Sequence, residues 1–153
     1  MRVVLDTNVL VSGLLKPASP AAQIIRLSLI GKIEIAYDER IITEYGEVLR
    51  RPRFPFTRDQ VETLLAEIRR VGISLVAEPN PISLPDPDDE PFLEMAWTAQ
   101  ARAIVTGNKK HFPSRVCRGL LVLSPREFLD FFRKTIPAPK RKKPTAGIVN
   151  FRH

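Results

Sequence analysis

The sequence has very few residues that could cross-link the chain. Its 153 residues include a single cysteine, Cys117, so no disulfide can form within the chain, and no histidine or second cysteine stands at zinc-binding spacing from it. We therefore expect a cytoplasmic protein in which Cys117 is a small core residue. A chain of this length buries roughly two-thirds of its unfolded surface, which is enough to fold without cross-links.

Long apolar runs are also absent. No stretch approaches the roughly 20 consecutive apolar residues of a membrane-spanning helix, and the chain does not open with a basic-then-apolar leader. We expect a soluble protein with no targeting segment and no membrane partner.

Acidic residues are missing from the carboxyl-terminal end. The formal net charge is +7, and the seven lysines and arginines after residue 132 have no acid among them, whereas the first 132 residues hold 17 basic and 17 acidic side chains. We expect residues 1–134 to form one domain and residues 135–153 to form a basic, proline-rich tail. One cluster in this tail is expected to contact a polyanion such as RNA: Lys140, Arg141, Lys142 and Lys143.

Apolar periodicity predicts alternating strands and helices. Strands are expected at 2–5, 32–37, 73–77, 101–108 and 120–123, and helices at 20–30, 39–51, 58–71, 92–101 and 127–134. A loop rich in proline and acid is expected at 78–90. Such alternation is typical of an α/β fold, in which a mostly parallel sheet is covered by helices on both faces.

Several carboxylates stand near the ends of the predicted strands and helices, where they could together form a metal site. Asp6 ends the first strand, the pair Asp88-Asp89 precedes the helix after strand 73–77, and Glu44 lies beside the apolar stripe of helix 39–51. Acids gathered at one sheet edge repel unless a cation lies between them, and an oxygen-only cluster suits Mg²⁺ or Mn²⁺. Each acid also has a purely structural interpretation: Asp6 as a turn residue, Glu44 as an exposed helix acid and Asp89 as the N-cap of helix 92–101.

Three stretches of the chain together resemble a known family. They are LDTNVLVSGL at 5–14, IITEYGEVLRRP at 41–52 and DPDDEPFLEMAWTAQARAIVTGNKKHF at 86–112. In this order and spacing the sequence resembles the PIN-domain ribonucleases and, within them, the VapC-like toxins of prokaryotic toxin-antitoxin pairs. The resemblance covers residues 1 to about 132 and implies a PIN-like three-layer α/β/α sandwich.

The resemblance also implies roles for single residues. It places Asp6, Glu44 and Asp89 on the family's metal-binding acids, and Asp89 is preferred to Asp88 because Ala96 stands seven residues beyond it. Thr106 matches a polar residue near the scissile phosphate. Three further residues are expected to hold Asp6 and the metal water in place: Thr7, Asn8 and Ser12.

The implied function is metal-dependent hydrolysis of RNA. The resemblance suggests an endoribonuclease that uses Mg²⁺ or Mn²⁺ and leaves a 5′-phosphate and a 3′-hydroxyl, with a cognate antitoxin as partner and a homodimeric assembly. His111 and His153 are the only histidines, so the sequence does not favour a histidine pair for metal-free chemistry. His111 is expected to be a loop contact or a solvated residue.

Two other functions compete with this interpretation. The first is a degenerate PIN domain that binds RNA or a protein without cleaving it. The second is an aspartyl-phosphate phosphatase with Asp6 as the nucleophile. That chemistry calls for an acid where this chain has Asn8, and for a threonine before the late acid pair, whereas Thr106 follows it.

Asn108 stands where many PIN domains have a fourth acid, which yields a first prediction. An amide removes one negative charge from the site, so a metal would rely on Asn108 itself, or on Asp86 or Asp88 from the adjacent loop. Asn108→Asp should lower the Mn²⁺ concentration that gives half-maximal cleavage, and calorimetry should show tighter binding. Unchanged affinity in Asn108→Asp, with weaker binding in Asp86→Asn or Asp88→Asn, would assign the fourth position to the loop.

Overall fold

The computed structural model describes residues 1–79, 81 and 83–136, and within them a parallel sheet forms the centre of the molecule. Its strands lie in the order β3-β2-β1-β4-β5. Val3 of β1 lies opposite Ile35 of β2 and Ala103 of β4. The strands are β1 (Arg2–Leu5), β2 (Glu34–Tyr37), β3 (Ile73–Ser74), β4 (Ala103–Val105) and β5 (Leu121–Leu123). The basic cluster at 140–143 lies outside the described residues.

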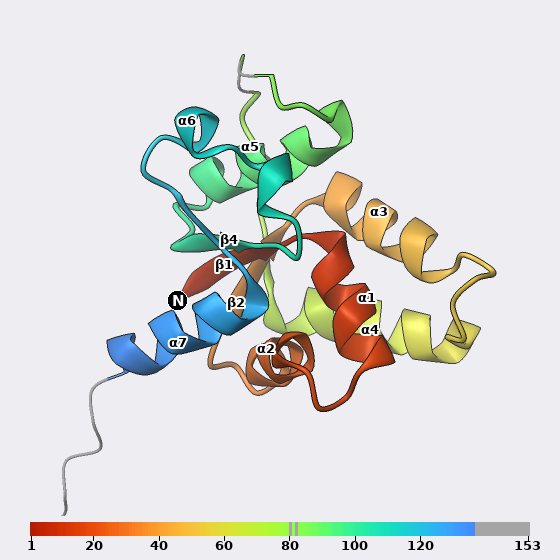
Figure 1. Cartoon of the computed structure of the whole chain (residues 1–153). Coiled ribbons are helices and arrows are strands. Elements are labelled where there is room, and N and C mark those ends of the chain that lie inside the picture. The colour runs from red at the N-terminus through yellow and green to blue at the C-terminus, as the bar shows by residue number, and fades with distance from the viewer. Residues whose placement is uncertain (80, 82, 137–153) are drawn as a thin grey trace, which may run out of the picture.

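Helices cover the sheet on both sides (Figure 1). One side carries α2 (Pro20–Leu29), α4 (Arg58–Val71) and α7 (Pro125–Thr135). The other side carries α5 (Glu90–Thr98) and the short α6 (Ser114–Cys117). Helices α1 (Thr7–Leu15) and α3 (Glu39–Leu49) follow β1 and β2 directly. The arrangement confirms the expected three-layer α/β/α sandwich around a parallel sheet.

The core lies between these layers and is built from the apolar side chains of strands and helices. Val3, Val4 and Leu5 of β1 are completely buried, because helices cover both faces of a central parallel strand. Cys117 is free and fully buried, as expected of a small core residue. In the described residues we find no helix that combines the length and the apolar character needed to cross a bilayer.

Several helices begin where the sequence predicts. Ser19 caps α2 ahead of Pro20, and Asp38 accepts a hydrogen bond from the backbone N–H of Ile41 at the start of α3. Full capping boxes open α4, from Thr57, and α7, from Ser124.

Other elements differ from the sequence prediction. Helix α1 was not expected, because Asp-Thr-Asn is typical of a turn, yet residues 7–15 form a helix that buries Val9, Leu10 and Gly13. Strands β3 and β4 are shorter than the predicted 73–77 and 101–108, and Val76 is 91% exposed. The structure adds α6 and two 3-10 turns, η1 (Pro87–Asp89) in the predicted loop and η2 (Lys109–His111) after β4.

The capping role considered for Asp89 is also wrong. Asp89 occupies the N-cap position of α5, but its side chain accepts no capping hydrogen bond. Asp86 instead opens this segment by accepting a hydrogen bond from the N–H of Asp88 at 2.9 Å. The Asp89 carboxylate is therefore available for another role.

The carboxyl edge of the sheet gathers the polar residues. Strands β1, β2 and β4 are followed directly by Asp6, Asp38 and Thr106, so these side chains emerge at one edge, where ligands bind in open α/β sheets. Helix α3 is fixed there by the buried Tyr45, whose hydroxyl donates to the carbonyl of Leu5 at 2.6 Å.

The close approach of α1 and α2 at Gly13 yields a second prediction. A Cβ at Gly13 would collide with the Ile25 side chain and lie 3.1 Å from the backbone nitrogen of Ala22. Gly13→Ala should lower the free energy of unfolding by about 1–2 kcal/mol, because the clash outweighs the gain in helix propensity. Urea unfolding measures this, with Leu15→Ala at the exposed end of α1 as a near-neutral control. A more stable Gly13→Ala protein would contradict the tight packing.

Candidate metal centre

Asp6 is held in one orientation by three neighbouring groups. Its backbone N–H donates to the carbonyl of Val105 at 2.9 Å, which ties it to β4. Its Oδ2 accepts hydrogen bonds from the hydroxyl of Thr106 at 2.8 Å and from the amide of Asn8 at 3.1 Å. Asn8 is itself fixed, because its Oδ1 accepts from the N–H of Gly107 at 2.9 Å. The buried Asp6 carboxylate therefore has a defined position.

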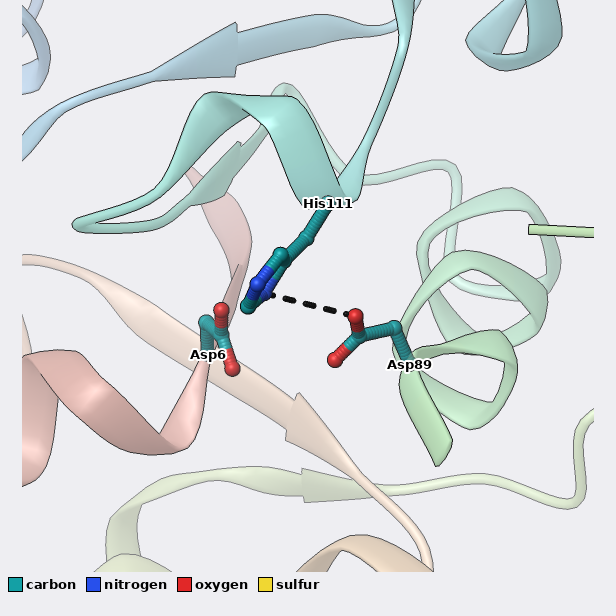
Figure 2. A group of neighbouring side chains, drawn as sticks. All are labelled: Asp6, Asp89 and His111. Carbon is teal, nitrogen blue, oxygen red and sulfur yellow. Dashed lines mark ion pairs between the residues drawn. The ribbon is translucent and has the colours of Figure 1, made fainter. Parts of the chain in front are cut away.

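Asp89 approaches from the other side of the same pocket (Figure 2). It lies at the end of η1 and is 7% exposed, and its Oδ2 is buried with no hydrogen-bond partner among the residues that the structure describes. His111 Nδ1 lies 3.4 Å from that oxygen without forming a hydrogen bond. Ligand atoms of Asp6, Asp89 and His111 all lie within 4.8 Å of one another.

His111 makes a loop contact, as expected, and its ring also lies beside the two buried aspartates, which was not expected. The turn η2 follows β4 and directs the imidazole toward Asp89 (Figure 2). Asn108 Oδ1 accepts from the N–H of Lys110, so its amide group donates to His111 Nε2 at 2.9 Å. The ring proton is therefore assigned to Nδ1, the nitrogen that faces Asp89.

Glu44 lines the same pocket but stands outside the group of facing ligand atoms. It is half-buried on α3, and its carboxylate accepts a hydrogen bond from the hydroxyl of Thr7. This half-buried position agrees with the expected place of Glu44 beside the apolar stripe of its helix. Thr7 links it to the first turn of α1, next to Asp6.

The remaining predicted site residues lie farther from these carboxylates. Ser12 is exposed on α1 and is not among the pocket-lining residues. Asp86 and Asp88 are exposed, and Asp88 lines a neighbouring groove together with Glu44. The side chain of Asn108 contacts His111 rather than either buried aspartate.

The electrostatics of the pocket favour a bound cation. Burial, and after it the nearby charge of Asp6, raises the pKa of Asp89 to about 7, while the His111 imidazole opposes the shift. Burial also raises the pKa of Asp6, against the hydrogen bond from Thr106. For Glu44, burial raises the pKa and the Thr7 hydroxyl opposes it.

The donor set fits a divalent ion. Two buried carboxylates and one imidazole face a common point, and one carboxylate oxygen lacks any partner among the described residues. A cation there would satisfy that oxygen and offset the mutual repulsion of the acids. Carboxylate oxygens favour Mg²⁺ or Mn²⁺.

The pocket has a volume of about 260 Å³ and is lined by basic and aromatic side chains as well as by acids. Besides the acids it is lined by Arg51, Arg53 and Phe54, from the loop between α3 and α4. These three residues were not predicted from the sequence as part of the site. The signal was present in the stretch RRPRFPF at 50–56, which interleaves basic and aromatic side chains as nucleic-acid-binding segments do.

Comparisons with known proteins agree with this fold. The family model of the PIN domain matches residues 2–110. The uncharacterized protein MJ1680 of Methanocaldococcus jannaschii is 26% identical over 147 residues, covering 89% of this chain and 94% of that protein. Among solved structures, a chain in the crystal structure of VapBC2 from Rickettsia felis bound to a DNA fragment from their promoter superposes with a TM-score of 0.51 and 15% identity. The match covers 80% of this chain and 97% of that chain.

The fold and the carboxylates at the sheet edge define a PIN-like α/β protein. Because the family model spans most of the chain, the protein belongs to the PIN domain family. This membership confirms the resemblance and leaves the aspartyl-phosphate phosphatase without support.

The raised pKa of Asp89 yields a third prediction, for the metal-free protein. In the unfolded chain Asp89 loses its proton above its ordinary pKa of 3.8, whereas in the folded protein it keeps the proton up to about pH 7. The free energy of unfolding therefore falls as the pH rises from about 4 to about 7. At pH 8 in EDTA, Asp89→Asn should therefore melt several degrees above the wild type, and the gap should shrink toward pH 4. Asp130→Asn, an exposed acid on α7, serves as control. A gap independent of pH would contradict the shift.

Proposed function

We propose that this protein is an endoribonuclease that hydrolyses RNA with Mg²⁺ or Mn²⁺ bound by Asp6, Asp89 and Glu44. The observation that carries the proposal is the buried, unpartnered Oδ2 of Asp89 facing the fixed carboxylate of Asp6. Membership of the PIN domain family supports it, since PIN domains are generally nucleases that bind divalent metals.

The chain's own residues prepare the site for this chemistry. A bound divalent ion would supply Lewis-acid activation and would neutralise the charge that develops on the phosphodiester. Thr106 and Asn8 keep Asp6 oriented, and Thr7 does the same for Glu44. Such fixed outer partners matter because a misdirected ligand weakens both metal binding and catalysis.

His111 and Asn108 have a supporting role in this proposal. His111 presents its Nδ1–H beside Asp89, where it can orient the carboxylate. Asn108 fixes the imidazole through Nε2. The Asn108 amide therefore contributes to the site by holding the His111 ring, as a hydrogen-bond donor that a carboxylate at position 108 could not supply.

A protein partner forms part of the proposal. The similar fold in VapBC2 from Rickettsia felis comes from a two-component complex on promoter DNA. By analogy, we propose that this protein is the toxin of such a pair, that an antitoxin inhibits it and that it forms a homodimer. We further propose that Lys140, Arg141, Lys142 and Lys143 contact RNA phosphates.

The fourth prediction tests the catalytic acids. Asp6→Asn, Asp89→Asn and Glu44→Gln should each reduce Mn²⁺-dependent RNA cleavage more than about 100-fold, because each removes a charged ligand. Cleavage is followed on single-stranded and structured RNA, with product ends identified as 5′-phosphate and 3′-hydroxyl. Calorimetry with Mn²⁺ should show weakened binding in the same variants.

The controls separate catalysis from folding. Asp130→Asn should cleave at the wild-type rate, and the site variants should remain folded in EDTA, since neutralising a crowded acid relieves repulsion. Near wild-type cleavage by all three site variants would overturn the assignment. Tight RNA binding with no cleavage at any Mn²⁺ or Mg²⁺ concentration would favour the degenerate PIN domain.

A further inference from the structure

The loop between α3 and α4 carries a stack of side chains at the rim of the acidic pocket. Phe54 and Phe56 are stacked, with ring centroids 5.5 Å apart and ring planes 21° from parallel. The guanidinium carbon of Arg53 lies 4.8 Å from the centroid of the Phe54 ring. Arg53 and Phe54 line the pocket that holds Asp6, Glu44 and Asp89. The stack therefore stands next to the carboxylates.

This loop is held in shape by its own backbone. The N–H of Phe54 donates to the carbonyl of Arg51 at 3.0 Å, which closes a turn with Pro52 at its second position, where proline is favoured. Pro55 restricts Phe54 to an extended backbone. The capping box of Thr57 then starts α4. In Figure 1 the loop forms the right-hand edge of the molecule, between α3 and α4.

Of the two stacked rings, Phe56 has a role in core packing and Phe54 does not. Phe56 packs against the hydrophobic core. Phe54 is half-exposed, lies outside that core and is supported by Phe56 and Arg53. An aromatic ring in this position contributes little to the core and faces a pocket of charged groups.

The charges around the stack suit a polyanion. Arg51 and Arg53 are exposed, and neither forms an ion pair within residues 1–79, 81 and 83–136. Arg58, at the far end of the loop, is by contrast paired with Glu62 at 2.9 Å. Arg51 also lines the neighbouring groove of about 590 Å³ along α3, so unpaired cations border both openings beside the acids.

We propose that Arg53 and Phe54 form a stacking platform for an unpaired base of single-stranded RNA, with Arg51 contacting the adjacent backbone phosphate. The inference rests on the proposed function, which places the reacting phosphate at the neighbouring acids. Planar guanidinium and aromatic groups stack on any base, whereas bases inside a duplex are already covered on both faces. The platform therefore selects single-stranded segments and holds one base beside the metal site.

Binding to labelled RNA tests the platform directly. The full chain carrying Asp6→Asn, which should leave RNA uncut, is titrated with an unstructured RNA nonamer that holds 2-aminopurine at successive positions. We expect fluorescence quenching at one position. Adding Phe54→Ala or Phe54→Leu should remove the quenching and weaken binding about 5- to 100-fold, whereas Phe54→Tyr should preserve both.

Further variants separate stacking from charge. Arg53→Lys keeps the charge but loses the planar group, so it should reduce quenching while leaving the salt dependence of binding unchanged. Arg133→Ala removes an exposed arginine from α7 and is the matched control. With the RNA annealed to its complement, Phe54→Ala should have no effect, because the platform does not engage a paired base. Melting temperatures confirm that each variant is folded.

The outcomes distinguish the platform from the nuclease. RNA binding within twofold of the parent in both Phe54→Ala and Phe54→Leu, with no quenching, overturns the platform even if the wild type cleaves RNA. If quenching at one position is lost in Phe54→Ala while the wild-type protein cleaves no RNA, the platform is supported and the proposed nuclease is overturned. Loss of a co-purified protein partner in Phe54→Ala, with RNA binding unchanged, would assign the loop to protein recognition and would also overturn the proposal.

Discussion

The burial of Asp6 and Asp89 on opposite sides of one small pocket is the constraint on which the functional part of this structure depends. Each carboxylate raises the free energy of the other's charged form, and burial adds to the cost. Only a proton or a cation relieves this, since the Oδ2 of Asp89 has no hydrogen-bond partner among the described residues. A pocket of this kind weakens the metal-free fold and stabilises the metal-bound one.

The surrounding polar residues are arranged to keep these acids in place. Thr106 and Asn8 fix Asp6, Thr7 fixes Glu44, and Asn108 fixes His111. These contacts join the ends of β1 and β4 to the start of α1, and they link α1 to the middle of α3. Because the strands are parallel, all of these ends meet at one edge of the sheet. The fold therefore assembles the site from segments that are distant in sequence.

The acidic pocket and the stacked loop complement each other in charge. In the proposed nuclease, divalent ions would be drawn to the acids and phosphates to Arg51 and Arg53, which line the same pocket. A nuclease needs both, because its acids alone would repel the polyanionic substrate.

The sequence by itself determined the order of strands and main helices, the capping residues and the acids at strand ends, because these depend on local periodicity and local hydrogen bonds. It did not determine helix α1, whose Asp-Thr-Asn start is equally compatible with a turn and whose helical state follows from packing of Val9 and Leu10. Only the tertiary structure placed His111 beside Asp89 and Arg53 beside the acids, since those contacts link residues brought together by the sheet. The tertiary structure also decided that Asp89 does not cap α5. In the turn η1 it is Asp86 that accepts the backbone hydrogen bond, from the N–H of Asp88.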